Sequence, residues 1–242
     1  MTVEEHILRG YYESGALEYE VPFVENKCQG ILKCYYESGE LQLEITYVDD
    51  KLEGFERTYH KNGMLLSEVP YVNGLKNGKL KGYNEKGTLQ YESFFVNDVM
   101  NGDFKVYYEN GGLKALATYK NNCIEGLYQE YYENGILRLE VTFVNDKEDG
   151  FERAYYSNGQ LKSEVFYING SREGFYKEYY ENAALKYESF FVNDVEKGII
   201  KKYSENGALI HTTDIDKLES ILQECERLIS DIRNISKNIE VR

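Results

Sequence analysis

Three histidines and four cysteines are the side chains of this chain best suited to bind a metal ion or to act as nucleophiles. They are His6, His60, His211, Cys28, Cys34, Cys123 and Cys225. The histidines stand far apart, and the cysteines lack the spacing of zinc ligands. The segment V-N-D-K-E-D-G at 144–150 lacks the alternating ligand pattern of a calcium loop. No phosphate-binding loop or zinc-protease motif is present either. We therefore expect no catalytic residue, no metal site, no cofactor and no enzymatic activity.

Glutamates are the remaining candidates, because paired carboxyl groups can act as general acid and base. Seven glutamates stand at multiples of 24 residues from one another, at Glu20, Glu44, Glu68, Glu92, Glu140, Glu164 and Glu188. Seven basic residues recur in the same way, at Lys33, Arg57, Lys81, Lys105, Arg153, Lys177 and Lys201. Because a catalytic pair would occur once, we interpret these two columns as a solvated face of a repeated structure.

The composition narrows the classes of partner. The 242 residues include 42 acidic and 28 basic side chains, which gives a net charge of −14, and 24 Tyr and 11 Phe but no Trp. So many aromatic residues are not typical of a disordered acidic tail. The negative charge argues against binding to nucleic acid or to an anionic membrane. No apolar run is long enough to cross a bilayer, and the acidic start of the chain does not resemble a secretory leader. We expect a cytoplasmic protein with reduced thiols.

A repeat of 24 residues runs through most of the chain and must position all these side chains. Its tyrosine column is Tyr11, Tyr35, Tyr59, Tyr83, Tyr107, Tyr131, Tyr155, Tyr179 and Tyr203. A glycine follows four residues later in eight of nine units, with Ala183 as the exception, and a leucine follows six residues later in all nine. A second glycine column runs from Gly30 to Gly198. The unit reads Y-Y-E-N-G-x-L-x-x-E-x-x-[FY]-V-N-[DG]-x-x-x-G.

Each unit is predicted to form a β-hairpin. In the unit 150–174, two segments rich in aromatic and β-branched residues flank Ser157-Asn158-Gly159, a tight-turn signal. A longer turn, Asn169 to Gly174, is expected to join one unit to the next. The predicted fold is an all-β repeat: an elongated antiparallel meander of about nine hairpins and about seventeen strands, in one twisted sheet.

Two registers are open for this hairpin. A three-residue loop with a left-handed Gly159 would pair Tyr155 with Leu161. A two-residue turn would instead pair Arg153 with Glu164 and so explain the charged columns. We favour the first, because burial of apolar side chains outweighs exposed ion pairs worth about 0–1 kcal/mol each. It would place one set of apolar residues on a single face, namely Phe151, Tyr155, Leu161, Val165 and Tyr167.

The repeat ends near residue 213, and the remainder is predicted to be an amphipathic helix. We divide the chain into a repeat domain, 1–213, and a C-terminal helix, 214–242, with Asp214 as its N-cap. The expected apolar stripe comprises Ile215, Leu218, Leu222, Cys225, Ile229, Ile232 and Ile239, widened by Ile221, Leu228 and Ile235. We favour a role in covering the edge of the last hairpin over dimerisation or contact with another protein.

The consensus motif resembles the MORN-repeat variant of bacterial toxin–antitoxin proteins of the YwqK type, over about residues 7–213. That resemblance implies a sheet of β-hairpins and a role as an antitoxin or immunity protein. The matching Tyr, Gly, Leu and Glu columns then look like scaffold positions without an active site. Ala183, Leu116 and Thr212 depart from the pattern, and we expect their units to bend differently.

We therefore predict a protein that binds and neutralises a cognate toxin, for example a basic toxin domain, as a monomer or a helix-mediated dimer. The net charge would steer the chain toward a basic cleft. The alternative is a general intracellular scaffold for several partners. The column after the invariant tyrosine varies and should lie opposite the invariant tyrosine face, where its rings either bind the partner or merely cover the sheet. The predicted partner-binding residues are Tyr12, Tyr36, Tyr108, Tyr132, Tyr156, Tyr180, Glu140 and Glu164.

Overall fold

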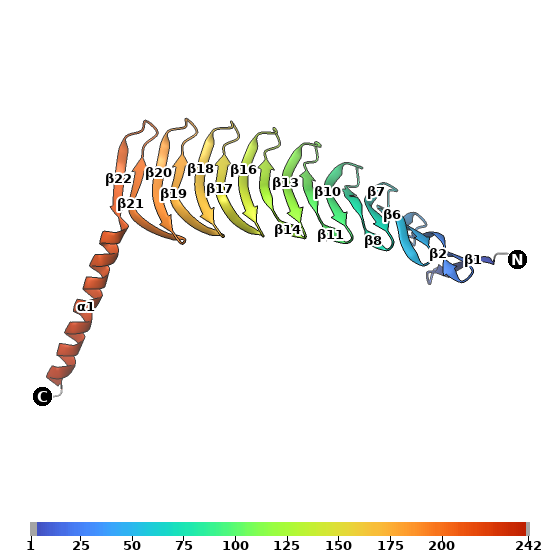
Figure 1. The fold of residues 1–242 in the computed structure, drawn as a ribbon, viewed down its shortest axis with the longest axis horizontal. Helices are drawn as coiled ribbons and strands as arrows, with labels where there is room; N and C mark the ends of the chain where they lie inside the picture. The colour runs from blue at the N-terminus through green and yellow to red at the C-terminus, as the bar shows by residue number, and fades with distance from the viewer. Residues whose placement is uncertain (1–3, 241–242) are drawn as a thin grey trace. The chain divides into compact units, whose positions relative to one another are not determined.

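The computed structural model describes residues 4–240, with side chains as far as residue 230. Within these residues it contains 22 strands in one antiparallel sheet and one helix (Figure 1). The strands of the first half are β1 (Glu5–Tyr11), β2 (Leu17–Val24), β3 (Lys27–Cys28), β4 (Gly30–Tyr35), β5 (Leu41–Val48), β6 (Lys51–Tyr59), β7 (Leu65–Val72), β8 (Leu75–Lys76), β9 (Gly78–Tyr83), β10 (Leu89–Val96) and β11 (Val99–Met100). They are followed by β12 (Gly102–Tyr107), β13 (Leu113–Lys120), β14 (Cys123–Ile124), β15 (Gly126–Tyr131), β16 (Leu137–Val144), β17 (Lys147–Tyr155), β18 (Leu161–Ile168), β19 (Ser171–Tyr179), β20 (Leu185–Val192), β21 (Val195–Tyr203), β22 (Leu209–Asp214) and the helix α1 (Ile215–Glu240).

The predicted nine hairpins are confirmed in the described residues. Nine hairpins give eighteen strands, one more than expected, and the first strand of four hairpins is interrupted just before its glycine, as between β3 and β4 or β8 and β9, which makes 22. By its contacts the chain divides into a first unit, Met1–Leu137 with Phe143–Asp146, and a second unit, Arg138–Thr142 with Lys147–Arg242.

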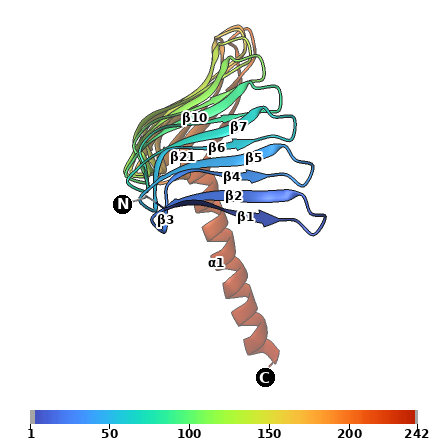
Figure 2. The same ribbon diagram turned by 90° about the vertical axis from the view of Figure 1, so that its right-hand side faces the viewer.

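Each unit has two chemically different edges. The loops within the hairpins lie along one edge, which we call the loop edge, and the connections between hairpins lie along the other, the turn edge (Figures 1 and 2). Since every repeat ends in the same two connections, residues 24 positions apart follow one another along each edge.

The loop edge is built from three-residue loops, as favoured from the sequence. In the loop after β17, Tyr156 N–H donates to the Gln160 carbonyl at 2.9 Å and Gly159 N–H to the Tyr156 carbonyl at 2.8 Å. Gly159 has φ +87°, a left-handed conformation that glycine adopts without strain. Ala183 keeps the same loop with φ +66°, so the expectation that its unit bends differently is wrong at the loop.

The two registers proposed for the hairpin both occur, on either side of a bulge. Next to the loop, Tyr155 pairs with Leu161. The register then shifts between Ala154 and Tyr155, and beyond it Arg153 pairs with Glu164. One extra residue in β18 therefore satisfies the loop geometry and the charge pairing together.

The bulge also changes which residues share a face. Phe151 pairs with Phe166 and Arg153 with Glu164, on what we call the ladder face. Val165 lies opposite Glu152 and hence on the other face, together with Tyr167. The prediction that Val165 and Tyr167 share a face with Phe151 is therefore wrong. Val165 is only 4% exposed, whereas Phe151 is 43% exposed.

The buried apolar side chains gather on the face of Val165, which we call the core face. Val69, Ala117 and Val141 occupy the same repeat position as Val165 and are also buried. Burial of each valine side chain stabilises the sheet by about 1.5–3 kcal/mol. In a single sheet these residues are covered by neighbouring side chains of the same face, so each repeat depends on the next.

The connections between hairpins are shorter than predicted. Asn169 and Gly170 alone form the turn between β18 and β19, with φ +52° and +87°. Positive φ at both positions defines a type I′ turn, which matches the twist of paired strands. Gly174 lies inside β19, beside the register shift between Glu164 and Phe166. The second glycine column therefore marks bulges or interruptions of the strand and is not part of a long turn.

The helix α1 begins as predicted but does not cover the last hairpin. The Asp214 carboxylate accepts a hydrogen bond from Lys217 N–H at 3.0 Å, which confirms the N-cap. Lys197 in β21 forms a 2.8 Å ion pair with Glu219. Beyond this first turn the described side chains are exposed, Leu222 to 62%, so the capping prediction is wrong for them. Ile232, Ile235 and Ile239 lie outside the described side chains, and a helix-mediated dimer stays a prediction.

No helix among the described residues is both long and apolar enough to cross a lipid bilayer.

Candidate functional site

The ladder face carries a repeated network of tyrosine, arginine and glutamate. Tyr59 donates its hydroxyl to Glu44 Oε1 at 2.8 Å. Arg57 binds two glutamates, Glu68 through Nε at 2.8 Å and Glu44 through Nη1 at 3.4 Å. The second unit repeats this arrangement, with Arg153 between Glu140 and Glu164. The two charged columns are therefore partners, as the register with Arg153 opposite Glu164 required.

Two predicted binding residues, Glu140 and Glu164, belong to this network. Glu140 accepts a hydrogen bond from Tyr155 at 2.9 Å, and Glu164 accepts one from Tyr179 at 3.3 Å. Burial, and next the hydrogen bond to Glu140, raises the pKa of Tyr155 to about 12. Both carboxylates are thus engaged within the sheet, and a role in binding a partner stays a prediction for them.

One rung of the network is neutral. Leu116 occupies a glutamate position, and it pairs with Gln129, which occupies a basic position. Tyr131, whose usual acceptor would be the residue at 116, donates instead to Gln129 Oε1 at 2.9 Å. The glutamate and the basic residue of this rung are thus replaced together by Leu116 and Gln129. The register is unchanged, since Lys105 pairs with Leu116 as basic residues pair with glutamates elsewhere. The expectation that Leu116 changes the course of its unit is therefore wrong.

The variable tyrosine column forms a second set of contacts between repeats. Each hydroxyl donates to the main-chain carbonyl 23 residues later. The pairs are Tyr12 to Tyr35 at 2.7 Å, Tyr36 to Tyr59 at 2.8 Å, Tyr108 to Tyr131 at 2.6 Å, Tyr156 to Tyr179 at 2.7 Å and Tyr180 to Tyr203 at 2.8 Å. His60 contacts the Tyr83 carbonyl in the same way at 3.2 Å, and Tyr132 is also half-buried.

These tyrosines therefore connect consecutive hairpins, whatever else they bind. Tyr156 lies near Lys186 and Glu178 of the core face, which places it opposite Tyr155, as expected. Basic side chains cover several of the rings, as Lys162 does at 5.8 Å from the Tyr156 ring centre. The structure thus supports the alternative that these rings cover the sheet, and their contact with a partner stays a prediction.

A row of exposed glutamates directly follows this tyrosine column along the loop edge. The row comprises Glu13, Glu37, Glu85, Glu109, Glu133, Glu181 and Glu205, all of which are exposed. The first five belong to the first unit. Sequence reasoning missed them, although the repeated Y-Y-E motif contained the signal. Two strands at about 4.8 Å each separate successive members by roughly 10 Å where the row is unbroken.

A polar hollow interrupts this edge in the first unit, beside Tyr108. It has a volume of about 460 Å³ and is lined by Gln90, Tyr107, Tyr108, Glu109, Asn110, Lys114 and Glu133. A differently lined hollow beside Tyr36 measures about 300 Å³. The tyrosine column is broken one repeat before the larger hollow by Asn84, which has no ring to cover the next hairpin.

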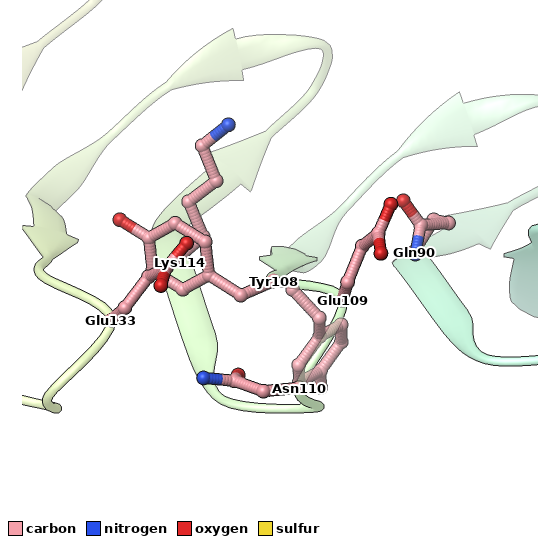
Figure 3. Close-up of a pocket in the computed structure, with 7 residues that line it drawn as sticks. Gln90, Tyr108, Glu109, Asn110, Lys114 and Glu133 are labelled. Carbon is pink, nitrogen blue, oxygen red and sulfur yellow. The ribbon is translucent and has the colours of Figure 1, made fainter.

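The hollow offers carboxylates and one unsatisfied amide. Glu109 forms an exposed 3.3 Å ion pair with Lys86, and Lys114 lies 5.6 Å from the Tyr108 ring centre. The buried Gln90 Nε2 has no hydrogen-bond partner among the described residues. Figure 3 shows Glu109 next to Gln90, and Glu133 near Tyr108 and Lys114. A lysine or arginine of a partner could contact these carboxylates and compete only with the exposed ion pair between Glu109 and Lys86.

The described residues include no group of three or more His, Cys, Asp or Glu side chains placed to hold a metal ion. All four cysteines are free thiols, and burial raises the pKa of Cys28. Cys28 lies opposite Phe23, whereas Cys225 is exposed on α1.

Comparison with known proteins gives a family match. A family model described as "MORN repeat variant" matches residues 29–49, 52–73, 76–97, 100–121, 124–145 and 148–169. No match is found among curated proteins. Among solved structures, a porin-like protein from Bacteroides uniformis is 10% identical over 87% of this chain and 94% of that chain. Its TM-score is 0.21, so that likeness carries no conclusion about function.

Proposed function

Because the chain belongs to the family of MORN repeat variants, we propose that it is a binding protein whose partner is another protein, which it blocks as an antitoxin blocks its toxin. It acts in the cytoplasm by direct contact, without catalysis and without nucleic acid or lipid as ligands. The repeat family itself suggests that the chain binds a partner. The identity of that partner as a toxin is our own addition.

The observation that carries the proposal is the row of exposed glutamates on the loop edge of the first unit, with the polar hollow in it. Five exposed carboxylates recur there at one repeat position, and two of them, Glu109 and Glu133, line the hollow. A basic protein surface would be attracted from a distance and then fixed in position by these side chains. Many toxins that attack nucleic acid need such a basic surface, because they must bind phosphates.

The proposal is tested by charge reversal in the hollow. The double variant Glu109→Lys with Glu133→Lys should weaken binding of the partner at least about tenfold, mainly through slower association at low salt. The partner is isolated by co-purification from the source cells and identified by mass spectrometry. Its affinity is then measured at two salt concentrations, and its toxicity is assayed with and without co-expression of the chain.

Glu181→Lys with Glu205→Lys is the matched control, because it reverses two charges of the same column in the second unit. It should leave the affinity within about threefold. That change is smaller than the loss expected for removing a carboxylate that contacts the partner directly. Equal losses in the control and the double variant would contradict a site at the hollow. A non-toxic partner, or several unrelated partners bound by different repeats, would contradict the antitoxin role and favour the scaffold.

A further inference from the structure

The outer edge of β1 carries the side chains that, in every later repeat, contact the preceding hairpin. Among the described residues β1 pairs only with β2, in the register Arg9 opposite Glu20. Leu8, Arg9 and Tyr11 occupy the positions that the preceding hairpin covers in all later repeats. We call these three residues the open rung.

Arg9 has one glutamate where the equivalent Arg57 and Arg153 have two. Its Nε lies 3.6 Å from Glu20, and its side chain is 46% exposed. Arg57 instead binds a glutamate on either side, one from its own hairpin and one from the preceding strand. The vacant position beside Arg9 therefore corresponds to that of Glu44 beside Arg57.

Tyr11 and Leu8 lack the same neighbour. Tyr11 is 59% exposed, and its hydroxyl has no partner among the described residues. Its equivalents Tyr35 and Tyr59 donate to a glutamate 15 residues earlier, at 2.9 and 2.8 Å. Leu8 is 51% exposed, whereas Ile200 at the same repeat position is 9% exposed. A donor and a cation on the ladder face and an apolar side chain on the core face thus all lack a neighbour at the open edge.

The opposite end of the sheet does not offer the complementary half. In the last hairpin, Thr212 stands at the glutamate position and Ser204 at the variable tyrosine position. Ser204 uses its hydroxyl locally, on the Ala208 carbonyl at 3.1 Å. The strand β22 of a second copy would therefore bring neither the carboxylate for Arg9 nor a tyrosine hydroxyl for the Tyr11 carbonyl. This chemistry points away from head-to-tail assembly of identical chains.

We propose that the outer edge of β1 binds an acidic β-strand of a different protein, which adds to the sheet antiparallel to β1. The glutamate of that strand lies opposite Arg9 and accepts the Tyr11 hydroxyl, as Glu44 lies opposite Arg57 and accepts from Tyr59. Main-chain hydrogen bonds supply the general attraction of an edge strand, and the open rung selects for the carboxylate. This site is separate from the acidic loop edge and takes a ligand of opposite charge.

The test uses a peptide with the sequence of Leu41–Asp50, LQLEITYVDD, because in the chain this segment covers the rung of Arg57 and Tyr59. A fluorescent form of the peptide is titrated with the full chain, and its anisotropy is recorded. We expect saturable binding that falls about tenfold when the glutamate equivalent to Glu44 is replaced by glutamine, as for loss of a charged hydrogen bond. Arg9→Glu should abolish binding of LQLEITYVDD and restore binding of the same peptide with arginine in place of that glutamate.

Matched variants separate the open rung from a general edge effect and from misfolding. Tyr11→Phe removes only the hydroxyl and should weaken binding a few-fold, with an unchanged melting curve. Thr212→Arg alters the other edge of the sheet and should have no effect. Equal binding of the glutamate and glutamine peptides, or loss of binding only in Thr212→Arg, would overturn the proposal. Sedimentation shows whether the chain forms dimers. Dimers that Arg9→Glu dissociates would mean that a second copy occupies the β1 edge, and this result would also overturn the proposal. Since no basic partner enters this experiment, its outcome is independent of the proposed toxin.

Discussion

The turn edge and the loop edge of the sheet both carry a recurring carboxylate, but they use it differently. On the turn edge, Asp50 accepts a hydrogen bond from the main-chain N–H of Cys28 at 2.7 Å, and Asp98 accepts one from Lys76 at 2.7 Å. Each such carboxylate holds the hairpin before it. On the loop edge, the residue that connects repeats is a tyrosine such as Tyr36, and the glutamate after it is exposed.

The difference teaches that acidic composition and exposure do not identify a binding surface. Asp50 and Glu37 are both exposed and both repeat along the chain, yet only the first has its oxygen committed to the preceding repeat. Carboxylates without such a commitment, or held only by an exposed ion pair as Glu109 is by Lys86, can contact a partner at little cost to the sheet. This is why the row on the loop edge carries the proposed function, whereas Glu140 and Glu164 carry the network between repeats.

The largest expected effect is that of Asp50→Ala on the turn edge. The substitution leaves the Cys28 N–H without its acceptor and places alanine at φ +63°, so it should destabilise the chain by about 2–3 kcal/mol. Thermal unfolding followed by circular dichroism measures the change. Glu37→Ala on the loop edge should stay within about 0.5 kcal/mol, and Asp50→Asn, which keeps an acceptor, should also be mild. Equal destabilisation by Asp50→Ala and Glu37→Ala would abolish the distinction between the edges.

A smaller effect is expected for Tyr36→Phe, within the loop edge itself. Loss of the hydroxyl removes the 2.8 Å hydrogen bond to the Tyr59 carbonyl, at a cost of about 1 kcal/mol. The melting temperature of the full chain reports it, with Tyr11→Phe as the control that lacks a partner to lose. If Tyr36→Phe and Tyr11→Phe melt alike, the tyrosine column does not connect the repeats, and it becomes available for a partner.

The smallest effect is a pH dependence on the turn edge at Asp194. Hydrogen bonds from the Arg172 N–H and then from its side chain lower the pKa of this carboxyl below its ordinary value of 3.8. A lowered pKa in the folded state means that the contribution to stability is present above the ordinary pKa and is lost as the pH falls through the lower one. NMR titration of Asp194, and melting curves of Asp194→Asn near pH 3 and pH 6, should show this loss only in the unsubstituted chain. A titration at or above 3.8 would show that this carboxylate is free, like those proposed for the loop edge.

Much of the fold could be predicted from the sequence, because a fixed repeat forces one local solution to recur. The nine hairpins, the left-handed Gly159 and the Asp214 cap followed from residue types with known backbone preferences. The sequence indicated both the pairing of Tyr155 with Leu161 and that of Arg153 with Glu164. Without the bulge the two pairings exclude each other, so only one could be favoured. The predicted face of Val165 was wrong for the same reason, because a single bulged residue moves every residue beyond it to the opposite face.

The candidate site was harder to predict, because each residue of the unit recurs and a repeat alone does not tell a contact within the sheet from a contact with a partner. The sequence by itself determined the period, the hairpin, the loop within it and the excess of negative charge, all of which depend on neighbours along the chain. Only the tertiary structure decided which side chain of one repeat meets which atom of the next, and hence which carboxylates remain free. That assignment depends on residues 13 to 23 positions apart, whose distance is set by strand register and not by their spacing in the sequence.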